Sequence, residues 1–236
     1  MAGTLYLIPT PLGEIAPQAC LPASALAHVN ALDLFFAEVP KSARAFLKAA
    51  GVERSFATIE ILTLTNDTPE AAIREGLAKV AAGRNAGMLS EAGAPAIADP
   101  GAMAIRIAHG LGIRVVPLVG PSAISLALMA SGLNGQRFGF HGYLPVKQPD
   151  LGRRIVALER DSKTLDQTQI FIETPYRNTR LFEALIATCQ PNTWLSIATD
   201  LTLETESITT RTIASWRSSP PSIERRPSVF LMLAAR

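Results

Sequence analysis

Apolar runs with the character of buried strands alternate with helix-like segments along nearly the whole sequence. Strands that alternate with helices pair in parallel and are covered on both faces, so this alternation predicts an α/β fold built on a mostly parallel sheet. Prolines at first turns, as at Pro69 and Pro100, support the helix starts. The strands are expected at 4–8, 33–37, 59–63, 86–90, 114–118, 138–144, 169–173, 194–199, 208–213 and 228–233. The helices are expected at 21–31, 41–50, 69–83, 100–111, 122–132, 150–160 and 177–189.

The pattern changes after the polar, proline-bearing segment 145–150. Beyond it the expected strands are more numerous, and helices separate them less regularly. We therefore expect two α/β domains. The first, 1–117, would hold the mostly parallel sheet, and the second, 118–236, would hold a mixed sheet with antiparallel strands toward its C-terminal end.

Composition bounds the class of protein. With 236 residues, 48% of them hydrophobic and 18% charged, the chain is long enough to bury a sizeable core and does not resemble a disordered protein. A net charge of +2 neither demands nor excludes a nucleic-acid partner. Cys20 and Cys189 lie far apart and there are three histidines, so we expect no metal site and two reduced thiols.

The N-terminus has no basic segment ahead of an apolar one, and it is broken at Pro9, so we expect no signal peptide. No apolar run reaches the roughly 20 residues that a membrane-spanning helix requires. The sequence therefore predicts a cytoplasmic protein that makes no use of a membrane.

Four of the expected strands end in an acidic residue. These residues are Glu38, Glu91, Glu173 and Asp200. In an open parallel sheet the carboxyl ends of the strands line one crevice where ligands bind, so the four acids are candidate catalytic groups. Acids at such positions also cap helices or complement helix dipoles, an alternative that is strongest for Asp200.

The loops at these strand ends are rich in glycine, alanine and proline. They cover 9–14, 90–101, 119–123, 143–147 and 173–177. Small residues let a ligand approach main-chain groups closely, and prolines limit the entropy lost on binding. Together the loops predict a preformed pocket that recognises its ligand mainly through backbone, although each loop alone is an ordinary turn.

Several common chemistries leave no trace in the sequence. The glycine fingerprints of dinucleotide-binding and P-loop proteins are missing after the first strand and elsewhere. The Gly-x-Ser-x-Gly elbow of hydrolases is missing as well, and histidines are too scarce to favour a Ser-His-Asp triad.

In order along the chain, the strand-end blocks resemble the tetrapyrrole-methylase superfamily of S-adenosylmethionine-dependent methyltransferases. Within it they are most similar to the branch that 2′-O-methylates a cytidine in small-subunit ribosomal RNA. The blocks are GTLYLIPTPLGE (3–14), AE (37–38), LSEAGAPAIADPG (89–101), RVVPLVGPSAISLALMASGL (114–133), RFGFHGYLP (137–145) and FIETPYR (171–177).

The resemblance implies two α/β domains with S-adenosylmethionine in the cleft between them, in a homodimer. It implies four groups of cofactor-binding residues. These are Pro9, Thr10 and Pro11 as a first wall; Gly93, Ala94, Pro95 and Ile97 beside the methionine and ribose; Ser122 and Ala123 from the next strand end; and Leu144, Ala198, Thr199 and Ser228 near the adenine.

The sequence departs from the ribosomal-RNA branch at several positions. It reads EVPK at 38–41 in place of an acidic-Asp-Thr-Arg run, and TDLTL at 199–203 in place of Arg-Glu-Leu-Thr-Lys. Glu91 replaces an aspartate and Ala94 a threonine. The longer members also carry a C-terminal extension beyond the last strand. Cofactor binding is therefore predicted more firmly than the methyl acceptor.

Methyl transfer to a hydroxyl needs a base, for which Glu38, Glu91, Glu173 and Asp200 are candidates. Arg177 could hold a phosphate or pair with a carboxylate. RNA is the expected partner by resemblance, with a basic rim from Lys147, Arg153, Arg154, Arg177 and Arg180.

Three interpretations stay open at this point. The chain could methylate ribosomal RNA, or be a related methyltransferase for another RNA or a small molecule such as a tetrapyrrole. It could also be a non-catalytic protein that binds S-adenosylmethionine.

Overall fold

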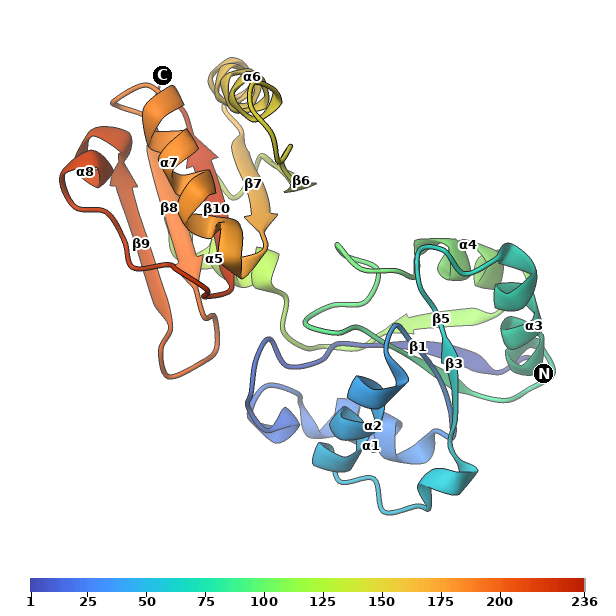
Figure 1. The fold of residues 1–236 in the computed structure, drawn as a ribbon. Helices are drawn as coiled ribbons and strands as arrows, with labels where there is room; N and C mark the ends of the chain where they lie inside the picture. The colour runs from blue at the N-terminus through green and yellow to red at the C-terminus, as the bar shows by residue number, and fades with distance from the viewer. Residues whose placement is uncertain (236) are drawn as a thin grey trace. The chain divides into compact units, whose positions relative to one another are not determined.

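The computed structural model describes residues 1–235. Within this range, ten strands form two five-stranded sheets, each in its own part of the chain (Figure 1). Contacts divide the chain into two compact units, Met1–Ser122 and Ala123–Arg236, a few residues beyond the boundary expected after residue 117. Within residues 1–235, no helix has both the length and the apolar character needed to cross a membrane.

The sheet of the first unit is entirely parallel, with strand order β3-β2-β4-β1-β5. Its strands are β1 (Thr4–Ile8), β2 (Leu34–Ala37), β3 (Glu60–Thr63), β4 (Ala86–Leu89) and β5 (Arg114–Pro117). Every residue of the inner strands β2 and β4 is buried. Pro117 falls on the edge strand β5, where a missing N–H costs no ladder hydrogen bond. The mostly parallel N-terminal sheet is confirmed.

Helices cover both faces of this sheet. They are α1 (Ala23–Ala31), α2 (Pro40–Ala49), α3 (Glu70–Ala81) and α4 (Ala102–Gly110), with short 3₁₀ turns at Pro17–Ala19 and Phe56–Thr58. Val29 of α1 and Leu47 of α2 pack in one hydrophobic cluster, whereas Leu77 of α3 and Ile107 of α4 pack in another. All parallel strands therefore direct their carboxyl ends to one edge between two helical layers.

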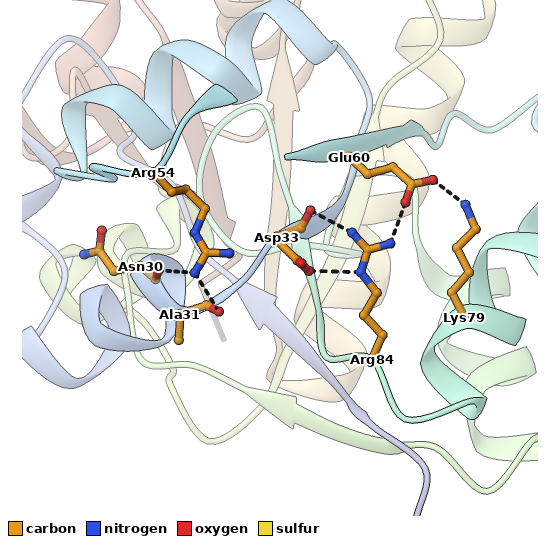
Figure 2. Close-up of polar contacts among 7 residues, drawn as sticks. All are labelled: Asn30, Ala31, Asp33, Arg54, Glu60, Lys79 and Arg84. Carbon is orange, nitrogen blue, oxygen red and sulfur yellow. Dashed lines mark hydrogen bonds and ion pairs between the residues drawn. The ribbon is translucent and has the colours of Figure 1, made fainter. Parts of the chain in front are cut away.

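An ion-pair network ties the opposite, amino-terminal edge of this sheet together (Figure 2). The Arg84 guanidinium donates to Asp33 Oδ1 at 2.9 Å and to Glu60 Oε2 at 2.6 Å, joining the segments before β4 and β2 to the first residue of β3. Lys79 of α3 bonds the other oxygen of Glu60. Lys79 and then Arg84 lower the pKa of the Glu60 carboxyl, because both cations favour its charged form.

The sheet of the second unit is mixed, with strand order β6-β7-β10-β8-β9. Its strands are β6 (Phe138–Tyr143), β7 (Thr168–Glu173), β8 (Trp194–Thr199), β9 (Ser207–Thr212) and β10 (Ser228–Leu233). The pair β6–β7 is parallel, and β10–β7, β10–β8 and β8–β9 are antiparallel. The mixed C-terminal sheet is confirmed too.

Three helices and a fourth short one accompany this sheet. They are α5 (Ala123–Ser131), α6 (Asp150–Leu165), α7 (Asn178–Thr188) and α8 (Ile213–Ser218), with a 3₁₀ turn at Pro175–Arg177. Helix α6 is longer than the expected 150–160, and its C-cap residue Asp166 lies in the left-handed region. Helix α8 was not expected: Thr212 caps it by accepting a hydrogen bond from the Ser215 N–H, so the chain leaves β9 one residue early.

Candidate functional site

Two strand-end loops of the first unit are joined by a small antiparallel bridge. Thr10, after β1, donates its N–H to the Gly93 carbonyl at 2.9 Å, and Gly93, after β4, donates back to the Thr10 carbonyl at 3.0 Å. The Thr10 hydroxyl lies 3.1 Å from Ser90 Oγ and 3.2 Å from the Ser90 carbonyl. Ser90 Oγ in turn donates to the Gly93 carbonyl. The predicted cofactor residues Thr10 and Gly93 are therefore brought together, and their loops are held rigidly.

The loop 90–101 has an uncommon backbone. Gly93 lies at φ +79° and Gly101 at φ +135°, and the alanines Ala96 and Ala98 both lie at φ +62°. For an alanine that region costs roughly 1–2 kcal/mol, and such conformations cluster at functional sites. Between the two alanines, Ile97 leaves half of its side chain exposed. This strain supports the expectation that the loop is shaped for a ligand.

A hollow of about 400 Å³ opens beside the joined loops. Thr10, Pro11, Ser90 and Glu91 line it from the loops, and α2 contributes mainly small side chains and Phe46. On the other side of the β1 loop, Gly120 approaches Pro9 so closely that an added Cβ would lie 2.6 Å from the Pro9 Cβ. The edge thus offers a largely apolar, backbone-rich surface with two carboxylates, Glu14 and Glu91, at its side.

Asp99 was missed as a site residue because the sequence suggested that Asp99 and Pro100 start the next helix. Helix α4 instead begins at Ala102, with Gly101 at its N-cap and no side-chain cap. Burial, and after it the negative charges of Glu38 and Glu91, raise the pKa of the Asp99 carboxyl to about 6, against a backbone hydrogen bond from Glu91 that lowers it. Within residues 1–235, its buried Oδ2 has no hydrogen-bond partner.

The two candidate acids of the first unit thus gather around Asp99. Neither Glu38 nor Glu91 has a side-chain hydrogen bond or ion pair to any residue of the described range 1–235. Because parallel strands β2 and β4 are neighbours, their carboxyl ends place these acids at one edge.

Glu173 and Arg177 of the second unit are partners. Glu173 Oε1 accepts from the Arg177 Nη2 at 2.5 Å and Nε at 3.0 Å, and from the Thr174 N–H at 2.6 Å. The Glu173 side chain is only 6% exposed. Of the two roles expected for Arg177, pairing with a carboxylate is the one that the structure displays.

Asp200 is paired in a similar way. Its Oδ2 accepts from Arg226 Nε and from the Thr205 hydroxyl, both at 2.8 Å, and its backbone lies at φ +51°. Next to it, Thr199 Oγ1 lies 3.1 Å from Ser228 Oγ. The strand register aligns Ser228 with both Thr199 and Glu173, so these predicted residues form one row at the strand ends.

The remaining predicted residues are placed less tellingly. Pro95, Leu144 and Ala198 are buried, whereas Ala94, Ser122 and Ala123 are half-buried. In the expected basic rim, Arg153 pairs with Asp150 and Arg154 bonds His141 Nδ1 at 3.0 Å. Their predicted contacts with cofactor or RNA stay predictions.

Comparison with known proteins places the chain among methyltransferases. The family model of Tetrapyrrole (Corrin/Porphyrin) Methylases matches residues 4–216. Two similar proteins are named Ribosomal RNA small subunit methyltransferase I. The one from Escherichia coli O157:H7 is 33% identical, over 87% of this chain and 68% of the relative. The one from Xylella fastidiosa is 33% identical, over 74% of this chain and 60% of the relative. The Haemophilus influenzae protein of that name is 31% identical, over 92% of this chain and 72% of the relative. The chain thus spans roughly three fifths to three quarters of these relatives.

Solved structures agree on the fold. The methyltransferase CobJ covers 99% of this chain and 95% of its own, with a TM-score of 0.65 and 17% identity. The second structure is Uroporphyrin-III C-methyl transferase from Thermus thermophilus, solved with S-adenyl homocysteine. Its alignment covers 98% of this chain and 97% of the transferase, with a TM-score of 0.57 and 16% identity. On the family match across most of its length, this chain belongs to the Tetrapyrrole (Corrin/Porphyrin) Methylases.

Proposed function

We propose that this S-adenosylmethionine-dependent methyltransferase methylates a ribose 2′-hydroxyl of small-subunit ribosomal RNA. The observation that carries the proposal is its identity of about one third, over most of the chain, with relatives named for that ribosomal RNA. The joined loops and the acidic edge of the first unit supply features that such a reaction requires.

The loop pair 9–14 and 90–97 suits S-adenosylmethionine in its chemistry. When bound, this cofactor supplies a methyl group on a positively charged sulfur. The Thr10–Gly93 bridge fixes main-chain groups in advance, so little entropy is lost when they receive a ligand. Small apolar side chains beside these main-chain groups exclude water. Carbonyl oxygens stabilise the positive charge of the sulfur and do not react with it.

Among the candidate bases, we favour Glu91. A hydroxyl acceptor must lose its proton as the new bond forms, and a nearby carboxylate takes it. Glu91 lines the hollow and is unpaired within residues 1–235, whereas Glu173 and Asp200 are each engaged by an arginine. Glu38 is the second choice, and Asp99 lies close to both.

A tetrapyrrole acceptor is the second candidate function. The two solved structures compared above are methyltransferases that this chain covers almost completely, and one acts on uroporphyrin-III by its name. The run TDLTL at 199–203 also lacks the basic residues expected of an RNA-methylating member, and EVPK at 38–41 departs from the acidic-Asp-Thr-Arg run. A non-catalytic role in binding S-adenosylmethionine is the third. We further propose a cytoplasmic homodimer.

Transfer of a labelled methyl group separates these functions. The purified protein is incubated with methyl-tritiated S-adenosylmethionine and, in parallel, with small ribosomal subunits, large subunits or uroporphyrinogen III. We expect label in small-subunit RNA and in neither alternative. Label in the tetrapyrrole alone would favour the second function, and cofactor binding without transfer to any acceptor would favour the third.

A further inference from the structure

A second hollow, of about 210 Å³, is lined by residues of the second unit alone. Strands β8 and β9, helix α8 and the segment 219–226 surround it. The register of β8 and β9 aligns Ser207 with Thr199 and Thr209 with Ile197. Since side chains alternate along a strand, Ser207, Thr209 and Arg211 point to one face of the sheet, into this hollow.

The charge of this hollow is positive. No carboxylate from residues 1–235 lines it, and its two cations are Arg211 and Arg226. Arg226 is committed within the protein, because it bonds Asp200 Oδ2 at 2.8 Å and the Ser222 carbonyl at 3.2 Å. Arg211 has no ion pair and no side-chain hydrogen bond to any residue from 1 to 235. One uncompensated positive charge therefore faces the hollow.

Arg211 is nevertheless held in place. Its guanidinium carbon lies 4.9 Å from the ring centre of Trp216, as in a cation–π contact. Trp216 is only 3% exposed, and its indole N–H donates to the Leu195 carbonyl at 2.8 Å. A guanidinium stacked on a fixed ring keeps its N–H edges free for a planar or tetrahedral oxyanion.

Hydroxyl groups supply further donors around Arg211. Their residues are Ser207, Thr209, Ser219 and Ser222, and none of these hydroxyls bonds another residue of the described part of the chain. Pro220 and Pro221 stiffen the segment that carries two of the serines. One free guanidinium with several hydroxyls matches the single negative charge and the several acceptor oxygens of a phosphodiester.

We propose that the hollow around Arg211 binds a backbone phosphate of the RNA substrate. Phosphate contacts of this kind fix the position of a nucleic acid without reading its sequence. The RNA assignment rests on the proposed function, whereas binding of phosphate by the hollow does not. Arg211 would thus position the substrate and take no part in the methyl transfer.

Trp216 allows the hollow to be tested without any enzymatic assay. The chain has two tryptophans, so Trp194→Phe, at a partly exposed site, leaves Trp216 as the only indole. We titrate inorganic phosphate at constant ionic strength and record tryptophan emission. We expect a saturable change that disappears in the Trp194→Phe, Arg211→Gln double variant and persists with Arg160→Gln, an exposed arginine of α6 paired with Asp161. No saturable change, or one that survives Arg211→Gln, would overturn the phosphate site.

The RNA assignment is tested by the kinetics of methyl transfer to small ribosomal subunits. Arg211→Gln should raise the KM for the subunits about tenfold, as expected for one lost charge-assisted contact. The kcat and the KM for S-adenosylmethionine should stay unchanged, and the salt slope of substrate binding should fall by roughly 0.7. The KM of Arg211→Lys for the subunits should lie between those of the wild type and Arg211→Gln, because lysine keeps the positive charge but lacks the planar guanidinium.

The outcomes keep the two proposals apart. If phosphate binds but Arg211→Gln leaves the KM for the subunits and the salt slope unchanged, the hollow holds a free phosphate or mononucleotide and the RNA assignment is wrong. If the wild-type protein methylates no RNA, the proposed function fails and the RNA assignment fails with it, while the titration still decides the phosphate site. Unchanged melting temperatures and near-ultraviolet spectra establish that the variants are folded.

Discussion

Thr10 and Gly93 exchange two backbone hydrogen bonds of 2.9 and 3.0 Å across residues that are far apart in sequence. Within the sheet β1 and β4 pair in parallel. Beyond it, the bridge joins the segments that follow these two strands in antiparallel orientation. It fixes the loops to which we assign the cofactor. The first prediction follows from the geometry of Gly93.

Gly93→Ala should weaken S-adenosylmethionine binding by at least tenfold. The residue lies at φ +79°, where an alanine costs roughly 1–2 kcal/mol, and its Cβ would lie 3.1 Å from Leu12 Cδ2. The loop would shift to relieve this strain. Calorimetric titration with the cofactor measures the effect.

Gly112→Ala is the matched control. Gly112 lies at φ +68° before β5, with no other atom within 4 Å of an added Cβ, so it carries the same backbone cost at the opposite edge of the sheet. Its melting temperature should fall while its cofactor affinity is preserved. Equal affinity losses in both variants would show that general destabilisation is the cause.

Asp99→Asn should stabilise the protein at neutral pH and not at pH 4. The folded protein raises the pKa of Asp99 from 3.8 to about 6, so folding disfavours the ionised form. The loss of folding stability caused by ionised Asp99 is absent below the unfolded pKa. It develops between about pH 4 and pH 6 and stays constant above pH 6. Because the carboxyl keeps some solvent contact, we expect a gain on the order of 1 kcal/mol.

Denaturant unfolding of wild-type and Asp99→Asn proteins at pH 4 and pH 8 measures this difference. Asp67→Asn, an exposed loop residue, is the control and should change neither value. A gain of the same size at both pH values would contradict the assigned cause, which requires ionisation of Asp99.

Glu91→Gln and Glu173→Gln should have opposite signatures. Removing a general base lowers kcat by roughly 10²–10⁴-fold, which we expect for Glu91→Gln without a change in melting temperature. Glu173→Gln leaves the Arg177 guanidinium without its partner in a mostly buried place, so it should lower the melting temperature and spare kcat. Single-turnover methyl transfer and thermal unfolding of both variants measure these effects. A normal kcat in Glu91→Gln would show that Glu91 is not the general base.

Arg84→Met should lower stability by about 1 kcal/mol at pH 7 and leave cofactor binding intact. The side chain joins Asp33 and Glu60 at the sheet edge away from the loops (Figure 2). Since the lowered pKa of Glu60 stabilises the fold above its unfolded value near 4.5, the loss should shrink as the pH falls through the folded pKa. Arg74→Met, which breaks an exposed pair within α3, should cost less. An affinity loss in Arg84→Met would contradict the separation of the two edges.

Much of the fold was readable from local pattern. The strands β1, β8 and β10 have the bounds that their mostly apolar runs predicted, because strands of a covered sheet are largely apolar in sequence. Glu173 and Thr199 end their expected strands and Ser228 begins its own, and the antiparallel register of β10 with β7 and β8 brings the three into one row.

Features that depend on distant partners were not readable. The raised pKa of Asp99 comes from burial and from Glu38 and Glu91, which only the folded sheet brings near. Asp200 was expected as a base, yet its pairing with Arg226 depends on a loop that no periodic pattern describes. The short helix α8, and with it the stack of Arg211 on Trp216, follows a local cap that was too brief to predict.

The most direct test of the account locates the transferred methyl group. Small ribosomal subunits that lack the modification are incubated with the protein and labelled S-adenosylmethionine, and their RNA is digested with nuclease and analysed by mass spectrometry. We expect label on a ribose 2′-oxygen, seen as a methylated nucleoside that resists alkaline cleavage on its 3′ side. A methyl group on a base, or RNA without label while the protein binds the cofactor, would contradict it.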